Sequence, residues 1–192
     1  MAGYRGYELV KRLYNEEKDI IKGAEVGCFK GKLAAFLLHS LPNLFLNMVD
    51  FWQAFPPEES ISDDYHHTLT QQEMEGCMYV AAISTGFAED RRKMWKGKSV
   101  DMANEIEDES LDFVFIDAGH TYRECLEDLT AWYPKIKKGG LVSGHDFLNP
   151  VCSEGVEDNG WGVKQAVDEF TEKLGVEYEV GSDFTYFFTK DK

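Results

Sequence analysis

Short apolar runs alternate with helical patterns along most of the sequence, and this alternation limits the fold more than any other feature. We predict strands at 20–26, 44–50, 94–95, 111–116 and 141–143. Helical patterns lie between and after them, at 33–38, 70–87, 100–106, 122–136 and 163–174. Strands and helices that alternate are joined by right-handed crossovers and form a mostly parallel sheet covered on both faces. The predicted fold class is therefore α/β, with one doubly wound, Rossmann-like sheet.

The two ends of the sequence add a helix and a hairpin. Apolar residues at helical spacing over 7–19 predict an N-terminal helix within segment 1–19. Residues 176–180 and 184–189, separated by Gly181-Ser182-Asp183, predict an antiparallel hairpin. We interpret Gly139-Gly140 as a turn and 147–161 as a lid loop over the site. Residues 1–192 are expected to form a single domain.

Composition excludes several function classes. No stretch of 18 apolar residues exists and residues 1–19 have no continuous apolar core, so we expect neither a membrane span nor a signal peptide, and we expect a cytoplasmic protein. The 20 basic residues against 35 acidic ones give a formal charge of −15, which disfavours nucleic acid as a partner. The four cysteines show no metal-binding spacing. The acidity favours a neutral or cationic small-molecule ligand or a bound divalent metal, and we expect a homo-oligomer.

A glycine-containing turn joins the first strand to the first long helix. It runs Glu25-Val26-Gly27-Cys28-Phe29-Lys30-Gly31, and glycines there let a ligand approach the backbone. Asp50 stands 23 residues after Gly27, at the end of the second strand. An acid at about 20 residues beyond such a loop accepts hydrogen bonds from ribose hydroxyls. Together these features indicate an adenosine-type cofactor.

Acids and histidines follow the fourth and fifth strands. Asp117 and His120 come after 111–116, and His145 and Asp146 come after 141–143. Neighbouring parallel strands end at the same edge of a sheet, so we expect the four side chains to face one small volume. Two carboxylates with imidazole nitrogens suit Mg²⁺ or Mn²⁺. We predict a divalent-metal site with His120 as a general base.

Three blocks of the sequence carry a family resemblance. They are EVGCFKG, then VDFW, then the run from FIDAGH to GHD with GVKQAVDEF after it. Over about residues 20–175 the chain resembles class I S-adenosylmethionine (SAM)-dependent methyltransferases, most of all methyltransferase family 24. That family is related to catechol and macrolide-sugar O-methyltransferases. The resemblance implies a seven-stranded sheet whose last strand is antiparallel.

The same resemblance implies roles for individual residues. Glu25, Gly27 and Gly31 would line the methionine end of SAM, with Asp117 beside it. Asp50 would hold the ribose, and Phe51 and Ser99 would flank the adenine. Relatives bind their metal through the residues that match Asp117, His145 and Asp146, and they carry a base where His120 stands. Asp117 and His120 are therefore the predicted catalytic pair.

The function expected from these residues is SAM-dependent, metal-assisted O-methylation of a sugar or glycan hydroxyl. Two alternatives stay open: a metal-independent methyltransferase acting on a phenol or an amine, and a SAM-binding module without activity. Trp52, Tyr65 and Trp161 lie in loops near the site and are candidates to stack on a substrate ring. His66-His67 is interpreted as an ordinary polar loop segment.

Overall fold

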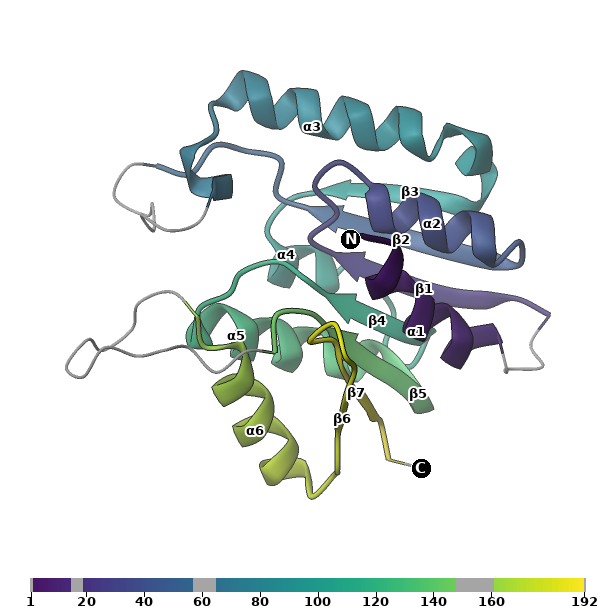
Figure 1. Cartoon of the computed structure of the whole chain (residues 1–192), viewed down its shortest axis with the longest axis vertical. Coiled ribbons are helices and arrows are strands. Elements are labelled where there is room, and N and C mark those ends of the chain that lie inside the picture. The colour runs from purple at the N-terminus through teal and green to yellow at the C-terminus, as the bar shows by residue number, and fades with distance from the viewer. Residues whose placement is uncertain (1, 15–18, 57–64, 148–160, 192) are drawn as a thin grey trace.

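Seven strands form one sheet in the order β3-β2-β1-β4-β5-β7-β6 in a computed structural model of the chain (Figure 1). The structure describes residues 2–14, 19–56, 65–147 and 161–191. The strands are β1 (Ile21–Val26), β2 (Leu44–Asp50), β3 (Arg92–Lys96), β4 (Leu111–Ile116), β5 (Ile136–Gly144), β6 (Glu179–Val180) and β7 (Tyr186–Thr189). Strands β1 to β5 pair in parallel, and β7 pairs antiparallel with both β5 and β6. The predicted fold class is confirmed.

The helices cover the sheet in two layers (Figure 1). One apolar core packs α1 (Ala2–Tyr14), α2 (Lys32–Ser40) and α3 (Gln71–Ser84) against one face of the sheet. The other core packs α4 (Ser99–Ala103), α5 (Tyr122–Trp132) and α6 (Val163–Leu174) against the opposite face. Short 3₁₀ segments complete the chain: η2 (Tyr65–Thr68), η3 (Gly86–Arg91) and η4 (Tyr133–Lys135). Because both faces are covered, the central strands β2 and β4 are buried along most or all of their length.

Local sequence sets several element boundaries. Strand β4 is buried at every position, with Phe113 and Phe115 in one core and Val114 and Ile116 in the other. Helices α3 and α5 each begin with a capping box, in which a threonine side chain and a glutamate three residues later satisfy each other's backbone N–H groups. These caps fix where α5 starts, five residues beyond Asp117.

Some boundaries differ from the sequence prediction. Helix α5 ends at Trp132, because the chain passes into the 3₁₀ turn η4, whose second residue, Pro134, has no N–H to continue the helix. Strand β5 already begins at Ile136, so Gly139-Gly140 lies inside the strand and not in a turn before it. The pairing with β4 shifts register at this point, and Gly139 takes a φ of 76° that glycine adopts without strain. Helix α1 begins at Ala2 and ends at Tyr14, and residues 15–18 lie outside the described part of the chain.

The C-terminal hairpin is confirmed, although β6 spans two residues only. Most of the predicted lid, residues 148–160, lies outside the described residues. None of the helices in the described ranges has the length and apolar character that crossing a membrane requires.

Candidate active site

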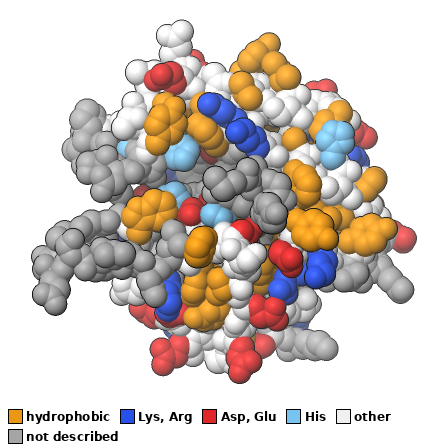
Figure 2. Space-filling view, in the orientation of Figure 1, with side chains coloured by type: hydrophobic (Ala, Val, Ile, Leu, Met, Phe, Trp, Pro, Cys, Tyr) orange, Lys and Arg blue, Asp and Glu red, His pale blue; other side chains and the backbone are white. Residues whose placement is uncertain are grey.

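A cavity of about 270 Å³ opens at the carboxyl ends of β1, β2, β3 and β4. This volume is close to the lower end of protein ligand pockets, at ~300 Å³. Five predicted site residues line it: Gly27, Asp50, Phe51, Ser99 and Asp117. Histidine and acidic side chains lie together near the middle of the face shown in Figure 2. The structure therefore brings most of the predicted cofactor residues to one pocket.

Glu25 lies on β1, two residues before Gly27, and is not among the residues that line the cavity. Its side chain is 2% exposed, and its Oε2 atom has no hydrogen-bond partner among the described residues. Burial raises the pKa of Glu25 well above its usual value, and the charges of Asp117 and Asp50 raise it further. A buried carboxylate with an open acceptor position is arranged to receive a cationic or hydrogen-bond-donating ligand group.

The two predicted glycines have different surroundings. Gly27 has a φ of 92°, and a Cβ atom there would lie 1.9 Å from the carbonyl oxygen of Asp117. Only glycine permits the β1 turn to pass so close to the end of β4. Gly31 has a φ of 69° at the start of α2, and its Cβ position lies 3.0 Å from Ala81 of α3. Gly31 is absent from the residues that line the cavity, and its geometry serves the approach of α2 to α3.

Asp50 ties the end of β2 to the glycine turn. Its Oδ2 accepts from the N–H of Phe29 at 2.7 Å, and its Oδ1 accepts from the N–H of Trp52 at 2.9 Å. Both donors have positive φ angles, 47° for Phe29 and 42° for Trp52, which are uncommon for non-glycine residues. Burial raises the pKa of Asp50, although these hydrogen bonds oppose the rise. The backbone N–H of Cys28 also acts on Asp50 as a hydrogen-bond donor, so about one of the roughly four acceptor positions of the carboxylate is left for a hydroxyl.

Trp52 does not face a substrate, which corrects the sequence interpretation. It is fully buried, and its indole Nε1 donates to the carbonyl of Phe29 at 2.8 Å. The positive φ of Trp52 turns the ring inward into the core formed with α3. Trp52 is therefore part of the framework that holds the glycine turn.

Ser99 and Asp128 line the cavity wall beyond the end of β3. Ser99 Oγ accepts from Trp132 Nε1 at 2.8 Å. Asp128 on α5 is 5% exposed and also lines the cavity. Burial raises the pKa of Asp128 to about 7, a hydrogen bond with Ser99 lowers it, and the charges of Glu124 and Glu127 raise it. No pattern in the sequence distinguishes Asp128 from the other acidic residues of this helix.

The acids and imidazoles after β4 and β5 gather as predicted. Asp117, His120 and Asp146 bring their ligand atoms within 4.8 Å of one another. His120 Nε2 lies 3.2 Å from Asp146 Oδ2. His145 Nδ1 lies 2.9 Å from Asp146 Oδ1 and 4.0 Å from Asp117 Oδ1. Asp117, His120 and Asp146 therefore form one group of possible ligands, and His145 lies beside that group without being a member of it.

Asp146 interacts with both histidines of this cluster. Burial raises the pKa of Asp146, but hydrogen bonds and charge from His120 and His145 outweigh it and hold the pKa well below its usual value. Asp146 also has a φ of 58°, which aspartate tolerates better than most residues. The backbone turn after β5 thus directs its carboxylate toward His120.

An aromatic side chain covers His120. Trp161 stacks on the imidazole with ring centroids 4.4 Å apart, and Gly162 donates its N–H to the His120 carbonyl at 2.7 Å. Because of this stacking, Trp161, one of the predicted aromatic residues, borders the cluster. It keeps 36% of its surface exposed. Tyr65 is exposed and is not among the residues that line the cavity.

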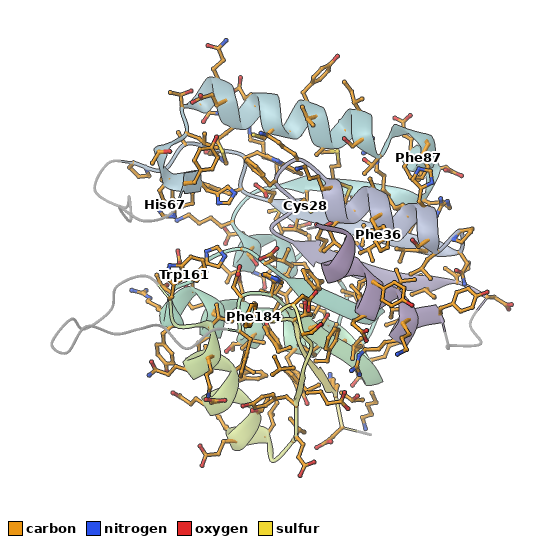
Figure 3. The ribbon with its side chains drawn as sticks, in the orientation of Figure 1. Cys28, Phe36, His67, Phe87, Trp161 and Phe184 are labelled. Carbon is orange, nitrogen blue, oxygen red and sulfur yellow. The ribbon has the colours of Figure 1, made fainter. Side chains whose placement is uncertain are left out.

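Two further histidines belong to the cavity. His66 and His67 on η2 both line it, which corrects their interpretation as an ordinary polar loop segment. His67 stacks on Phe55 with centroids 3.8 Å apart, and His66 meets the edge of Phe29 at 4.6 Å. Figure 3 shows His67 on η2 and Trp161 at the start of α6 on the same side of the molecule.

Comparison with known proteins identifies the family. A family profile described as a methyltransferase domain, methyltransferase family 24, matches residues 24–147. This range spans more than half of the chain and includes the glycine turn, Asp50 and the acid–imidazole cluster. The chain belongs to this methyltransferase family. It is a class I, SAM-dependent methyltransferase, as the sequence resemblance implied.

Solved structures share the fold of this methyltransferase. A Corynebacterium glutamicum protein is 14% identical, with a TM-score of 0.71 over 97% of this chain and 80% of its own. A provisionally assigned O-methyltransferase from Klebsiella pneumoniae is 19% identical, with a TM-score of 0.62 over 100% and 81%. The O-methyltransferase TomG of Streptomyces achromogenes, involved in tomaymycin synthesis and solved with SAM, is 16% identical, with a TM-score of 0.63 over 98% and 79%. At these identities the likeness establishes the fold alone, and no curated protein matches the sequence.

Proposed function

We propose that this methyltransferase transfers the methyl group of SAM to a hydroxyl of a sugar or glycan, with help from a divalent cation. One observation carries the proposal: Asp117, His120 and Asp146 converge within 4.8 Å beside a cavity that Gly27 and Asp50 also border. Transfer to a hydroxyl needs an oxygen nucleophile that loses its proton, and this cluster offers a base at that place.

The cavity residues fit SAM. The cofactor carries a positive sulfonium and an ammonium group, and Glu25 offers an orphaned buried oxygen that would hold the methionine end. Gly27 lets the turn after β1 lie close to Asp117, and Asp50 would use its remaining acceptor position for a ribose hydroxyl. We assign Phe51 and Ser99 to the adenine, since both line the cavity. Gly31 would act indirectly, by letting α2 start at the turn.

The donor set also fits a divalent cation. Asp117 and Asp146 supply carboxylate oxygens, the ligands that Mg²⁺ and Mn²⁺ prefer, and His145 would complete the set. When bound, such a cation supplies a Lewis acid that lowers the pKa of an acceptor hydroxyl. Excess negative charge at the strand ends would then be offset by the cation and the sulfonium together.

His120 is assigned as the base. Its Nε2 faces Asp146 at 3.2 Å, so the carboxylate stabilises the imidazolium that forms when His120 accepts the hydroxyl proton. Trp161 covers one side of the ring, and the Gly162 N–H holds its backbone carbonyl. These contacts restrict the imidazole to one orientation, which proton transfer requires.

Trp161 supports a sugar acceptor. Its partly exposed indole lies next to the base and offers an apolar surface for the C–H face of a sugar ring. The preference for sugars over phenols otherwise follows the resemblance to macrolide-sugar O-methyltransferases.

The test is transfer of labelled methyl from SAM to a panel of glycans, phenols and amines. We expect methylated glycan, loss of turnover with EDTA, and recovery with Mg²⁺ or Mn²⁺. Methylated phenol or amine that survives EDTA would support the metal-independent alternative instead. SAM binding without transfer to any acceptor class would indicate a binding module.

A further inference from the structure

The order of the strands determines which residues line each end of the cavity. Asp117 follows β4, Gly27 follows β1, Asp50 follows β2 and residues 97–100 follow β3, and these strands lie side by side in the order β4-β1-β2-β3. All four places border the same cavity. A cofactor with its reacting group near Asp117 and its ribose at Asp50 therefore carries its base toward residues 97–100.

Asp128 is the buried carboxylate at that end. It lies on α5, which packs against α4, and Ser99 is the first residue of α4. The indole N–H of Trp132 can only donate, so Ser99 accepts that bond and keeps its own proton to donate. Burial raises the pKa of Asp128 to about 7 and the hydrogen bond with Ser99 lowers it, so the carboxyl is ionised above that pH. The chain Trp132, Ser99, Asp128 thus fixes one carboxylate in the cavity wall.

We propose that Asp128 selects the base of the cofactor, by accepting a hydrogen bond from the exocyclic amino group of a 6-aminopurine. An ionised carboxylate offers only acceptors. Adenine presents a donor at its 6-position, whereas hypoxanthine presents a carbonyl oxygen there, which a carboxylate repels. The inference rests on the proposed SAM-binding role of the cavity and names the residue that distinguishes SAM from other nucleoside sulfonium compounds.

The experiment compares two ligands that differ at this one position. S-adenosylhomocysteine and S-inosylhomocysteine are titrated by calorimetry into the full chain and into Asp128→Asn, at about pH 8.5, where the carboxyl is ionised. The wild-type protein should prefer the adenine ligand roughly 10- to 100-fold, as expected for a hydrogen bond to a charged group. In Asp128→Asn the preference should fall close to unity, because the amide can donate to a carbonyl oxygen as well as accept from an amino group. Asp101→Asn removes an exposed carboxylate of α4 and should keep the wild-type ratio.

The ratio of the two affinities does not depend on how much of the variant is folded. Both ligands are measured on the same protein, so a partly unfolded fraction of Asp128→Asn cancels from the ratio. A ratio that is the same in wild type and Asp128→Asn would overturn the inference and leave SAM binding intact, and so would a wild-type protein that binds both ligands equally. If the wild-type protein binds neither ligand, the proposed cofactor role fails, and the inference fails with it.

Discussion

Replacing Asp128 by asparagine should change how the stability of the protein depends on pH. Asp128 is 5% exposed, and burial raises the pKa of its carboxyl from the usual 3.8 to about 7, against the opposing hydrogen bond with Ser99. Below the unfolded-state pKa the carboxyl is protonated in both states, and the stability it contributes is fully present. Between that pKa and about 7 the unfolded chain has released the proton while the folded protein still holds it.

The sign and size of the effect follow from this difference. Because the unfolded state binds fewer protons over this interval, the free energy of unfolding falls as pH rises. A shift of about 3 pKa units, at ~1.4 kcal/mol for each unit, corresponds to a loss of about 4 kcal/mol between about pH 4 and about pH 8. Asparagine does not titrate, so Asp128→Asn should not suffer this loss.

Urea unfolding of the cofactor-free protein at several pH values measures the effect. The stability of wild type relative to Asp128→Asn should decline steadily from about pH 4 to about pH 8. Glu25 also titrates, but it does so in both proteins and cancels from the difference. Asp101→Asn, which removes an exposed carboxylate, should follow the wild-type curve. Parallel curves for wild type and Asp128→Asn would refute the assignment of a raised pKa to this carboxyl.

Three substitutions test the proposed site. Asp50→Ala should weaken SAM binding at least ~10-fold, since hydrogen bonds to a charged group are worth about 1.5–3 kcal/mol; calorimetry that finds unchanged affinity would remove the ribose assignment. His120→Ala should lower turnover roughly 10²- to 10⁴-fold with SAM affinity nearly intact, as expected when a general base is lost; a fully active variant would show that another group takes the proton. Asp117→Ala should abolish Mg²⁺ or Mn²⁺ binding and turnover together, and retained metal affinity by calorimetry would exclude Asp117 from the ligand set.

The sequence predicts the sheet because its signal there is local. Strand β4 reads as an apolar run interrupted only by Asp112. Strand β2 ends in Asp50, and an acid or a histidine directly follows β4 and β5, which the hydrophobic pattern does not explain. The topology of parallel strands then places Asp50, Asp117 and Asp146 at one edge without any knowledge of side-chain contacts. The interpretation of Gly139-Gly140 as a turn is wrong. These residues lie inside β5, at a register shift that depends on the partner strand and cannot be seen in the local sequence.

The residues that the sequence does not predict owe their position to packing. Asp128 lies on an amphipathic helix, where an acidic residue is expected on the solvent-exposed face. It is buried in the structure, in which α4 packs against α5. His66 and His67 lie in a segment without periodicity, and contacts with Phe29 and Phe55 bring them to the cavity. Trp52 points inward because its backbone takes a positive φ, which its sequence context gives no reason to expect.

The acidic side chains around the cavity repel one another, and this repulsion favours the binding of a positively charged ligand. Glu25 is buried next to the charges of Asp117 and Asp50, and both raise its pKa. Asp128 is buried near Glu124 and Glu127, which raise its pKa as well. In a protein whose formal charge is −15, such an arrangement destabilises the cofactor-free fold. A ligand that carries positive charge relieves the repulsion, whereas a neutral ligand does not. The sulfonium of SAM therefore gains from groups that cost the free protein stability, and its neutral product, S-adenosylhomocysteine, gains less and is released more readily.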